Sequence, residues 1–169
     1  NKDMEINVWD RIIAFEGRMH EFIKAAYDYQ DNTFHSHPGY YIDYFEMRLA
    51  QLQVLHNLHY EIKKIRKMPK QALVIADYIM YMADYVVEMN IPDQQIEKLE
   101  EISEQMKQEE LPKTREEFEG RALLYHILMD LEEFLVYKKR FVNGLDEKKL
   151  RIYWKQEMEQ KDSVNELQK

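Results

Sequence analysis

Apolar residues recur along most of the chain at steps of three and four residues, the spacing of one face of an α-helix. The first such pattern covers about residues 4–29, and the second begins near Tyr40 and is stopped by Pro69, because the residue before a proline avoids helical geometry. Three more patterns cover residues 70–89, 93–109 and 115–143. The sequence therefore predicts an all-α fold, an antiparallel bundle of four to five long helices plus a C-terminal helical tail.

Local signals place the ends and inner faces of these helices. Asp93 is predicted to cap the fourth helix, and Thr114 with Glu117 has the spacing of a capping box at the start of the fifth. Gly144 is a natural stop. The inner face of the second helix is predicted to contain Phe45, Leu49, Leu52, Leu55, Ile62 and Ile65. That of the fifth is predicted to contain Phe118, Ala122, Tyr125, Leu128, Leu131 and Leu135.

The chain divides into a helical bundle domain over residues 1–142 and a charged extension over residues 143–169, which we expect to be partly helical. The mean hydropathy of −0.68 and the 33% of charged residues argue against a membrane span in these residues. The first residue is not Met and no signal peptide follows it, so we expect the chain to be a piece of a longer protein.

Composition narrows the function classes. With 24 basic against 32 acidic residues, the chain lacks the positive surface that nucleic-acid binding needs. It has no cysteine, and hence no thiol nucleophile or disulfide. No Glu precedes a His by three residues, as a di-metal bundle enzyme requires, and neither a serine elbow nor a phosphate-binding glycine loop is present. We therefore predict a protein that is not an enzyme and needs no cofactor.

The histidines leave a metal site open. His56 and His59 lie one helical turn apart, and Glu16 and His20 have the matching spacing on the first helix. Four such side chains from two neighbouring helices suit a transition metal. Equally, histidines at a helix surface need no ligand role.

A cluster of basic residues lies at the C-terminal end of the second predicted helix. Lys63, Lys64, Arg66 and Lys67 fill the predicted last turns of that helix, and Lys70 lies just beyond. Cations at this position offset the negative end of the helix dipole, so the cluster has a structural explanation without any partner.

Two stretches carry a family resemblance. Leu111-Pro-Lys-Thr-Arg-Glu-Glu-Phe-Glu-Gly-Arg-Ala-Leu-Leu-Tyr125, continued by residues 129–135, resembles the closing motif of the C-terminal domain of the putative aromatic acid exporter family. Tyr40-Tyr-Ile-Asp-Tyr-Phe-Glu-Met-Arg48 is similar to the start of that domain's central helix. The resemblance extends over about residues 1–142. It implies a non-catalytic domain on the cytoplasmic side of the cell membrane, following an N-terminal transmembrane part that is absent from this chain.

Assembly or regulation of that transmembrane part is the expected role. The alternative is a freestanding helical-bundle binding protein with a metal site. We also expect a homo-oligomer, because apolar residues such as Ile12 and Phe15 flank the main stripe of the first helix and exceed what one bundle hides.

Two binding surfaces follow from the same analysis. Arg48 and Arg121 are predicted to meet Tyr41 or Tyr44 between helices and hold an aromatic carboxylate, with pairing to glutamate as the competing interpretation. If a membrane helix precedes the chain, the second helix returns toward the bilayer. Its basic corner then faces anionic lipid. The same tracing brings three carboxylates to that end as competitors for the lysines: Glu109, Glu110 and Glu116.

Overall fold

The computed structural model is an all-α bundle, which confirms the predicted fold class. Four helices are described along their length: α2 (Pro38–Lys63), α3 (Ala72–Ala83), α4 (Asp93–Lys107) and α5 (Arg115–Asn143). Helical residues between 10 and 24 form a further element, the N-terminal segment. The structure describes residues 10–11, 13–15, 17–18, 20–21, 24, 38–145, 149–150, 152 and 154, and these contain no strand.

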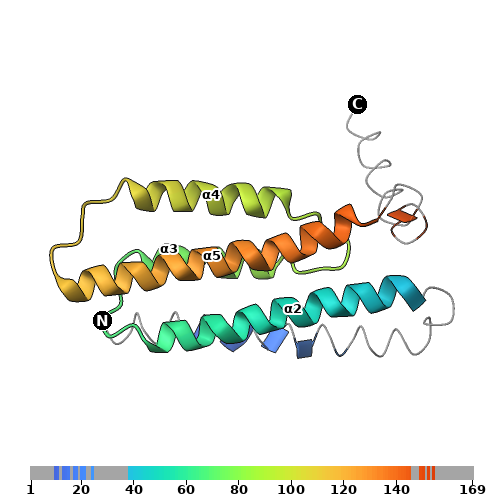
Figure 1. Ribbon diagram of the computed structural model, residues 1–169, viewed down its shortest axis with the longest axis horizontal. Helices are drawn as coiled ribbons and strands as arrows, with labels where there is room; N and C mark the ends of the chain where they lie inside the picture. Colours follow the sequence, from blue (N-terminus) through green and yellow to red (C-terminus); the bar gives the residue numbers. More distant parts are fainter. Residues whose placement is uncertain are drawn as a thin grey trace.

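The two long helices, α2 and α5, lie side by side and antiparallel (Figure 1). The side-chain amide of Gln51 donates a hydrogen bond of 2.8 Å to the carbonyl of Phe134. Toward the other end of α5, Gly120 lies against Pro69, which follows α2. A Cβ at position 120 would approach the Pro69 ring to 3.0 Å, so the absence of a side chain lets α5 pack closely against the chain leaving α2.

α4 covers the other side of α5 and also packs on α3 (Figure 1). The ion pair of Lys139 with Asp93 ties the end of α5 to the start of α4. The Tyr78 hydroxyl of α3 donates a hydrogen bond of 2.6 Å to the carbonyl of Gln95 in α4. Because α2 and α4 both run antiparallel to α5, the ends of α2 and α4 lie at the same end of the bundle.

The N-terminal segment runs parallel to α3. Arg11 forms an ion pair with Asp77, and Arg18 forms one of 3.1 Å with Asp84. The steps between partners are equal on the two helices, so both elements run in the same direction. Phe15, at 2% exposed, packs on Phe134 with ring centroids 5.6 Å apart. It is therefore part of the core and not surplus surface, while Ile12 lies outside the described residues.

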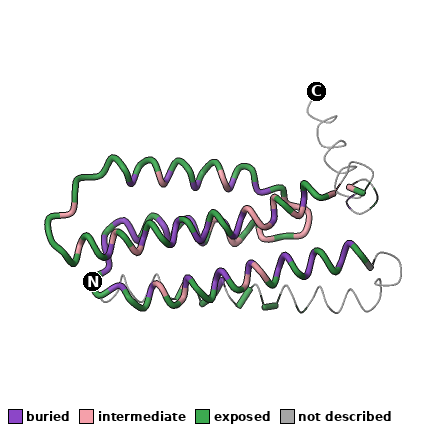
Figure 2. Tube along the Cα trace, in the orientation of Figure 1, coloured by how far each residue is buried: buried purple, intermediate pink, exposed green. Residues whose placement is uncertain are grey.

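Buried positions recur at regular turns along α2 and α5, whereas the α4–α5 connection and the first turns of α5 are exposed (Figure 2). Of the predicted inner residues of α5, Leu128, Leu131 and Leu135 are buried. Phe118 is 62% exposed and Tyr125 36% exposed, and Ala122 is exposed too. The apolar residues of α5 are compatible with two different buried faces of the helix. The structure buries the face that contains Gly120, which lies against Pro69, and not the predicted face that contains Phe118.

Leu49, another predicted inner residue, is 49% exposed on α2. The buried face of that helix instead includes two polar residues, Arg48 and Gln51. The buried face differs from the predicted one because the side chains of Arg48 and Gln51 form hydrogen bonds across the bundle. A prediction from the spacing of apolar residues alone leaves such polar residues out.

The end of α2, the end of α3 and the N-cap of α4 differ from prediction. α2 ends at Lys63, so of the basic cluster only Lys63 lies in the last helical turn, and the dipole does not account for the others. α3 ends at Ala83 instead of near residue 89. Asp93 is the first residue of α4, after Pro92, and makes no capping bond. The Thr114 cap is confirmed, since its hydroxyl accepts a 3.1 Å hydrogen bond from the Glu117 N–H.

Candidate functional site

A buried polar cluster joins α2, α5 and the α3–α4 connection, and Arg48 lies at its centre. Only 2% exposed, Arg48 donates hydrogen bonds to the Tyr44 hydroxyl at 3.1 Å and to the Gln51 side chain at 2.8 Å. A third reaches the carbonyl of Val87 at 3.1 Å. Buried charges are stable in proteins when such bonds replace water, so Arg48 links α2 to the chain that follows α3.

Lys138 of α5 reaches the same connection from the opposite side. The residue is 3% exposed, and its amine donates to the carbonyl of Val87 at 2.9 Å and also to that of Glu88. Burial, together with the nearby charge of Arg48, lowers the pKa of Lys138 to about 6. A neutral amine has two N–H donors, which match the two carbonyls. Tertiary bonds therefore hold both carbonyls of the α3–α4 connection.

Aromatic rings enclose the two basic side chains. The Lys138 amine lies 5.7 Å from the ring centre of Tyr44 and 5.8 Å from that of Trp154. The Tyr40 hydroxyl donates a 2.7 Å hydrogen bond to the Glu88 carboxylate and accepts one of 3.0 Å from the Trp154 indole. Burial raises the pKa of Tyr44 to about 12 and raises that of Tyr40 further. Both tyrosines stay protonated, and the Tyr40 hydroxyl donates to Glu88 while the Tyr44 hydroxyl accepts from Arg48.

The cluster borders a small cavity near the turn after α3. Its volume is about 10 Å³, close to the least space that holds one water molecule. Arg48, Gln51 and Lys138 line it, along with Asn90 and Gln95. In this arrangement the cavity has no room for an aromatic acid.

The four residues predicted to bind an aromatic carboxylate are not together. Tyr41 and Tyr44 are buried near Arg48, and Tyr41 packs edge-on against Tyr40 with ring centroids 5.0 Å apart. Arg121 lies thirteen positions before Phe134 on α5, which is about 20 Å along a helix. The two guanidiniums therefore do not meet, and carboxylate binding by Arg48 stays a prediction.

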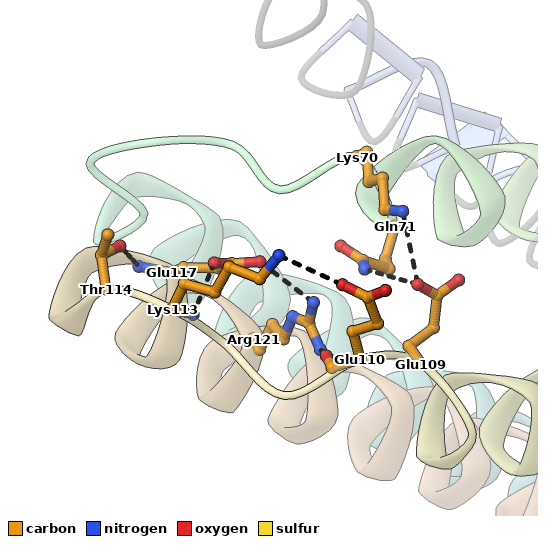
Figure 3. Close-up of polar contacts among 8 residues, drawn as sticks. All are labelled: Lys70, Gln71, Glu109, Glu110, Lys113, Thr114, Glu117 and Arg121. Atoms are coloured by element: carbon orange, nitrogen blue, oxygen red, sulfur yellow. Dashed lines mark hydrogen bonds and ion pairs between the residues drawn. The ribbon is translucent and has the colours of Figure 1, made fainter.

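Arg121 instead belongs to a polar network at the opposite end of α5 (Figure 3). It donates a 3.0 Å hydrogen bond to Glu117 and another to the carbonyl of Glu110. The backbone N–H of Lys113 and the Arg121 guanidinium lower the pKa of Glu117. Pairing with glutamate, the competing interpretation of Arg121, is thus what the structure contains.

The basic cluster lies at this same end, in and after the last turn of α2. Lys70 forms an ion pair of 3.4 Å with Glu109 (Figure 3), one of the carboxylates expected to compete with lipid for the lysines. Lys64 pairs with Glu61 at 3.0 Å, and the Lys63 amine lies 5.9 Å from the Tyr60 ring centre. Arg66 and Lys67 are exposed. Within the described part of the chain, neither forms an ion pair.

The predicted metal ligands are brought together only in part. His20 of the N-terminal segment and His56 of α2 are exposed neighbours with ring centroids 6.3 Å apart. His59 is half-buried one turn further along α2, and Glu16 lies outside the described residues. No group of three or more potential ligands occurs among the residues that the structure describes. Metal binding by these four residues stays a prediction.

Sequence reasoning missed Lys138, Gln51, Glu88 and Trp154 as members of the polar cluster. One signal was available for Lys138, which continues the buried stripe of Leu131, Phe134 and Val142 at helical steps. A lysine at a position of the core stripe means either that the buried face is wrongly predicted or that the lysine side chain is itself buried. Nothing local identifies Glu88 or Trp154, because their contacts connect distant parts of the chain.

Comparison with known proteins places these features in a family. The family model described as "Putative aromatic acid exporter C-terminal domain" matches residues 1–139. "Uncharacterized protein YqjA" of Bacillus subtilis (strain 168) is 32% identical over 98 residues, which make up 58% of this chain and 30% of that protein. The chain thus spans less than a third of that relative's length.

A solved structure has the same fold. The "putative membrane protein from Clostridium difficile 630" superposes with a TM-score of 0.59 at 23% identity, covering 83% of this chain and 93% of that one. Within the described residues, no helix has both the length and the apolar content needed to cross a bilayer. The matched residues include most of α5 and all the other helices, and the chain belongs to the family of putative aromatic acid exporter C-terminal domains.

Proposed function

We propose that this domain is the non-catalytic cytoplasmic part of an exporter-like membrane protein, and that it serves the assembly or regulation of the transmembrane part. Family membership supports attachment to a membrane protein. The buried polar cluster joins α2, α5 and the α3–α4 connection, and these tertiary bonds support a mechanical or regulatory role for the described helices.

One observation carries the orientation that we propose. Arg11 lies beside Asp77, midway along α3, and Arg18 lies beside Asp84, just after α3, so the N-terminal segment runs parallel to α3. α3 begins just after Lys70, at the bundle end that holds Lys63, Lys64, Arg66, Lys67 and Lys70, so the described segment runs away from that end. A chain that enters from a membrane arrives at this basic end.

Electrostatics supports the same orientation. Arg66 and Lys67 are exposed, and each basic side chain near an anionic bilayer contributes about 1 kcal/mol of attraction. The pairs of Lys64 with Glu61 and Lys70 with Glu109 reduce the effect. The two unpaired cations should therefore account for most of the lipid dependence.

The test uses the chain tethered to vesicles through an N-terminal histidine tag. Because the sequence contains no cysteine, Gln108→Cys and Gln94→Cys each give a single labelling site. Both positions are exposed, at opposite ends of α4, about 21 Å apart along the helix. A headgroup quencher should quench a fluorophore at position 108 more strongly. Stronger quenching at position 94 would contradict the orientation.

A charge control separates lipid attraction from the geometry of the tether. Arg66→Gln with Lys67→Gln should reduce the difference between the two labels on vesicles that contain phosphatidylserine. Lys24→Gln with Arg140→Gln changes the net charge equally at exposed positions elsewhere and should leave the difference intact. An equal effect of both pairs would exclude a specific basic face.

A further inference from the structure

α5 carries an apolar stripe that the described elements leave largely exposed. It consists of Phe118, Ala122, Tyr125 and Met129, at steps of four, three and four residues. Phe118 is 62% exposed and Met129 64% exposed. The spacing is that of a seam for a second helix, and the stripe extends about 16 Å along the axis. Such a surface is typical of helix-in-groove recognition.

Acidic residues dominate α4, the α4–α5 connection and the part of α5 that carries this stripe. Residues 93–133 contain thirteen acidic and five basic side chains. The excess of eight negative charges equals the formal net charge of the whole chain. The rest of the protein is therefore neutral in sum, and the net charge lies in residues 93–133, which include the stripe.

The register of α4 against α5 locates one acidic pair. Asp93 pairs with Lys139, and Lys107 interacts electrostatically with Tyr125. Glu100 lies midway between Asp93 and Lys107 on α4. Because the helices are antiparallel, it is level with Glu132, midway between Tyr125 and Lys139 on α5.

Glu100 and Glu132 thus form an acidic edge beside the stripe. Both are exposed, and in the part of the chain that the structure describes neither forms an ion pair. Like charges at one level repel each other, so a cation placed between them gains from both.

We infer that this surface, the stripe of Phe118, Ala122, Tyr125 and Met129 with the acidic edge of Glu100 and Glu132, binds a basic amphipathic helix from the cytoplasmic border of the protein's own transmembrane part. The inference rests on the proposed function. Cytoplasmic borders of membrane proteins carry an excess of Lys and Arg, which complements the acidic edge. The stripe begins in the first turns of α5, at the same end as Lys63 and Lys70, where the proposed orientation places the bilayer.

Other occupants fit the charge less well. A second copy bound through the same surface would bring two acidic edges together. An anionic bilayer would meet the same repulsion. The crosslinking experiment below distinguishes a second copy and a bilayer from the proposed helix.

The first experiment measures peptide binding by fluorescence anisotropy. The probe is a synthetic amphipathic peptide with leucines at heptad a and d positions and lysines beside them, about 14 residues long, slightly longer than the stripe. Phe118→Ser with Met129→Gln should weaken binding at least tenfold, as should Glu100→Gln with Glu132→Gln. All four positions are exposed, so folding should be retained, with circular dichroism as the check.

Matched controls use other faces. Ile42→Ser with Leu49→Gln removes exposed apolar surface from α2, and Glu21→Gln with Glu46→Gln removes two exposed carboxylates. Both should change the affinity less than twofold. Equal weakening by these controls, or equal binding of a scrambled peptide of the same composition, would overturn the inference.

The second experiment identifies the occupant in the full-length protein in its membrane. A photo-crosslinking amino acid at position 118 should capture a Lys- or Arg-rich segment of the same protein's transmembrane part, whereas the same group at position 49 should not. A crosslink between the stripes of two copies, or to lipid alone, would overturn it. The vesicle experiment does not involve this surface, so failure of the orientation and failure of the inference give separate results.

Discussion

The indole N–H of Trp154 donates a 3.0 Å hydrogen bond to the hydroxyl of Tyr40, at the start of α2. Trp154 is 5% exposed and lies over the amine of Lys138. A residue from the predicted extension therefore completes the buried polar cluster, and residues beyond α5 contribute to the stability of the bundle.

Two replacements of Trp154 should destabilise the fold to different extents. Trp154→Phe retains most of the ring but leaves the Tyr40 hydroxyl without its donor, so a loss of about 1 kcal/mol is expected in urea unfolding. Trp154→Ala also leaves a cavity and should cost about 3 kcal/mol or more. Equal small effects of both changes would mean that the side chain contributes little.

Lys138 should make stability rise with pH. Burial and Arg48 lower its pKa to about 6 in the folded state, while the unfolded chain keeps the ordinary value of 10.5. Between these values the unfolded state binds more protons, so the free energy of unfolding increases with pH, by about 1 kcal/mol per unit. Above about pH 10 the trend reverses, because buried tyrosines such as Tyr44 remain protonated only when folded.

Urea unfolding between about pH 7.5 and about pH 9.5 tests this linkage. Lys138→Met should flatten the slope, whereas Lys98→Met, at an exposed position, should preserve it. The same slope in both variants would show that another group causes it.

Two glycines should respond in opposite ways to added side chains. Gly17 lies in the N-terminal segment with no atom within 4 Å of an added Cβ. Gly17→Ala should therefore stabilise the helix by roughly 0.5–1 kcal/mol. At Gly120 a Cβ meets the Pro69 ring at 3.0 Å and the Lys67 carbonyl at 3.3 Å, and Gly120→Val should cost about 1–3 kcal/mol through overpacking. Thermal unfolding measures both, and a stabilising Gly120→Val would contradict the close contact.

Self-association of the isolated chain is a further prediction. With Phe15 buried, the apolar surface that supports it lies elsewhere, for example at Ile42 and Leu49, which are 46% and 49% exposed on α2. Light scattering should give a mass above the 20.7 kDa of the monomer that grows with concentration. Leu49→Gln should lower it and Phe118→Ser should not. A constant monomer mass at high micromolar concentration would refute the prediction.

The parts of the fold that depend on neighbouring residues were predictable. The five long helical patterns, the stop at Gly144 and the Thr114 cap depend on a few adjacent side chains, and the described structure contains each of those it covers. The contacts of the connection after α3 were not predictable, because the Val87 carbonyl is bound by Arg48 and Lys138 from two other helices.

The candidate site was harder to predict for the same reason. Sequence analysis selected Arg48 but paired it with Arg121, because Arg48 lies one turn after Tyr44 and Arg121 lies in the second turn of its helix. The register of α2 on α5 instead places Gln51 against Phe134 and separates the guanidiniums. That register depends on packing along the whole interface, including the close contact at Gly120.

The course of the chain also determines how the bundle carries mechanical force. The described N-terminal segment begins beside Asp77, midway along α3, and Trp154 is anchored beside Tyr40 at the end of the bundle opposite to the basic cluster. Tension between these two points acts along the helix axes, so it loads the side-by-side contacts in shear and not one after another. The hydrogen bond of Gln51 to Phe134 and the ion pair of Arg18 with Asp84 would resist such a load together.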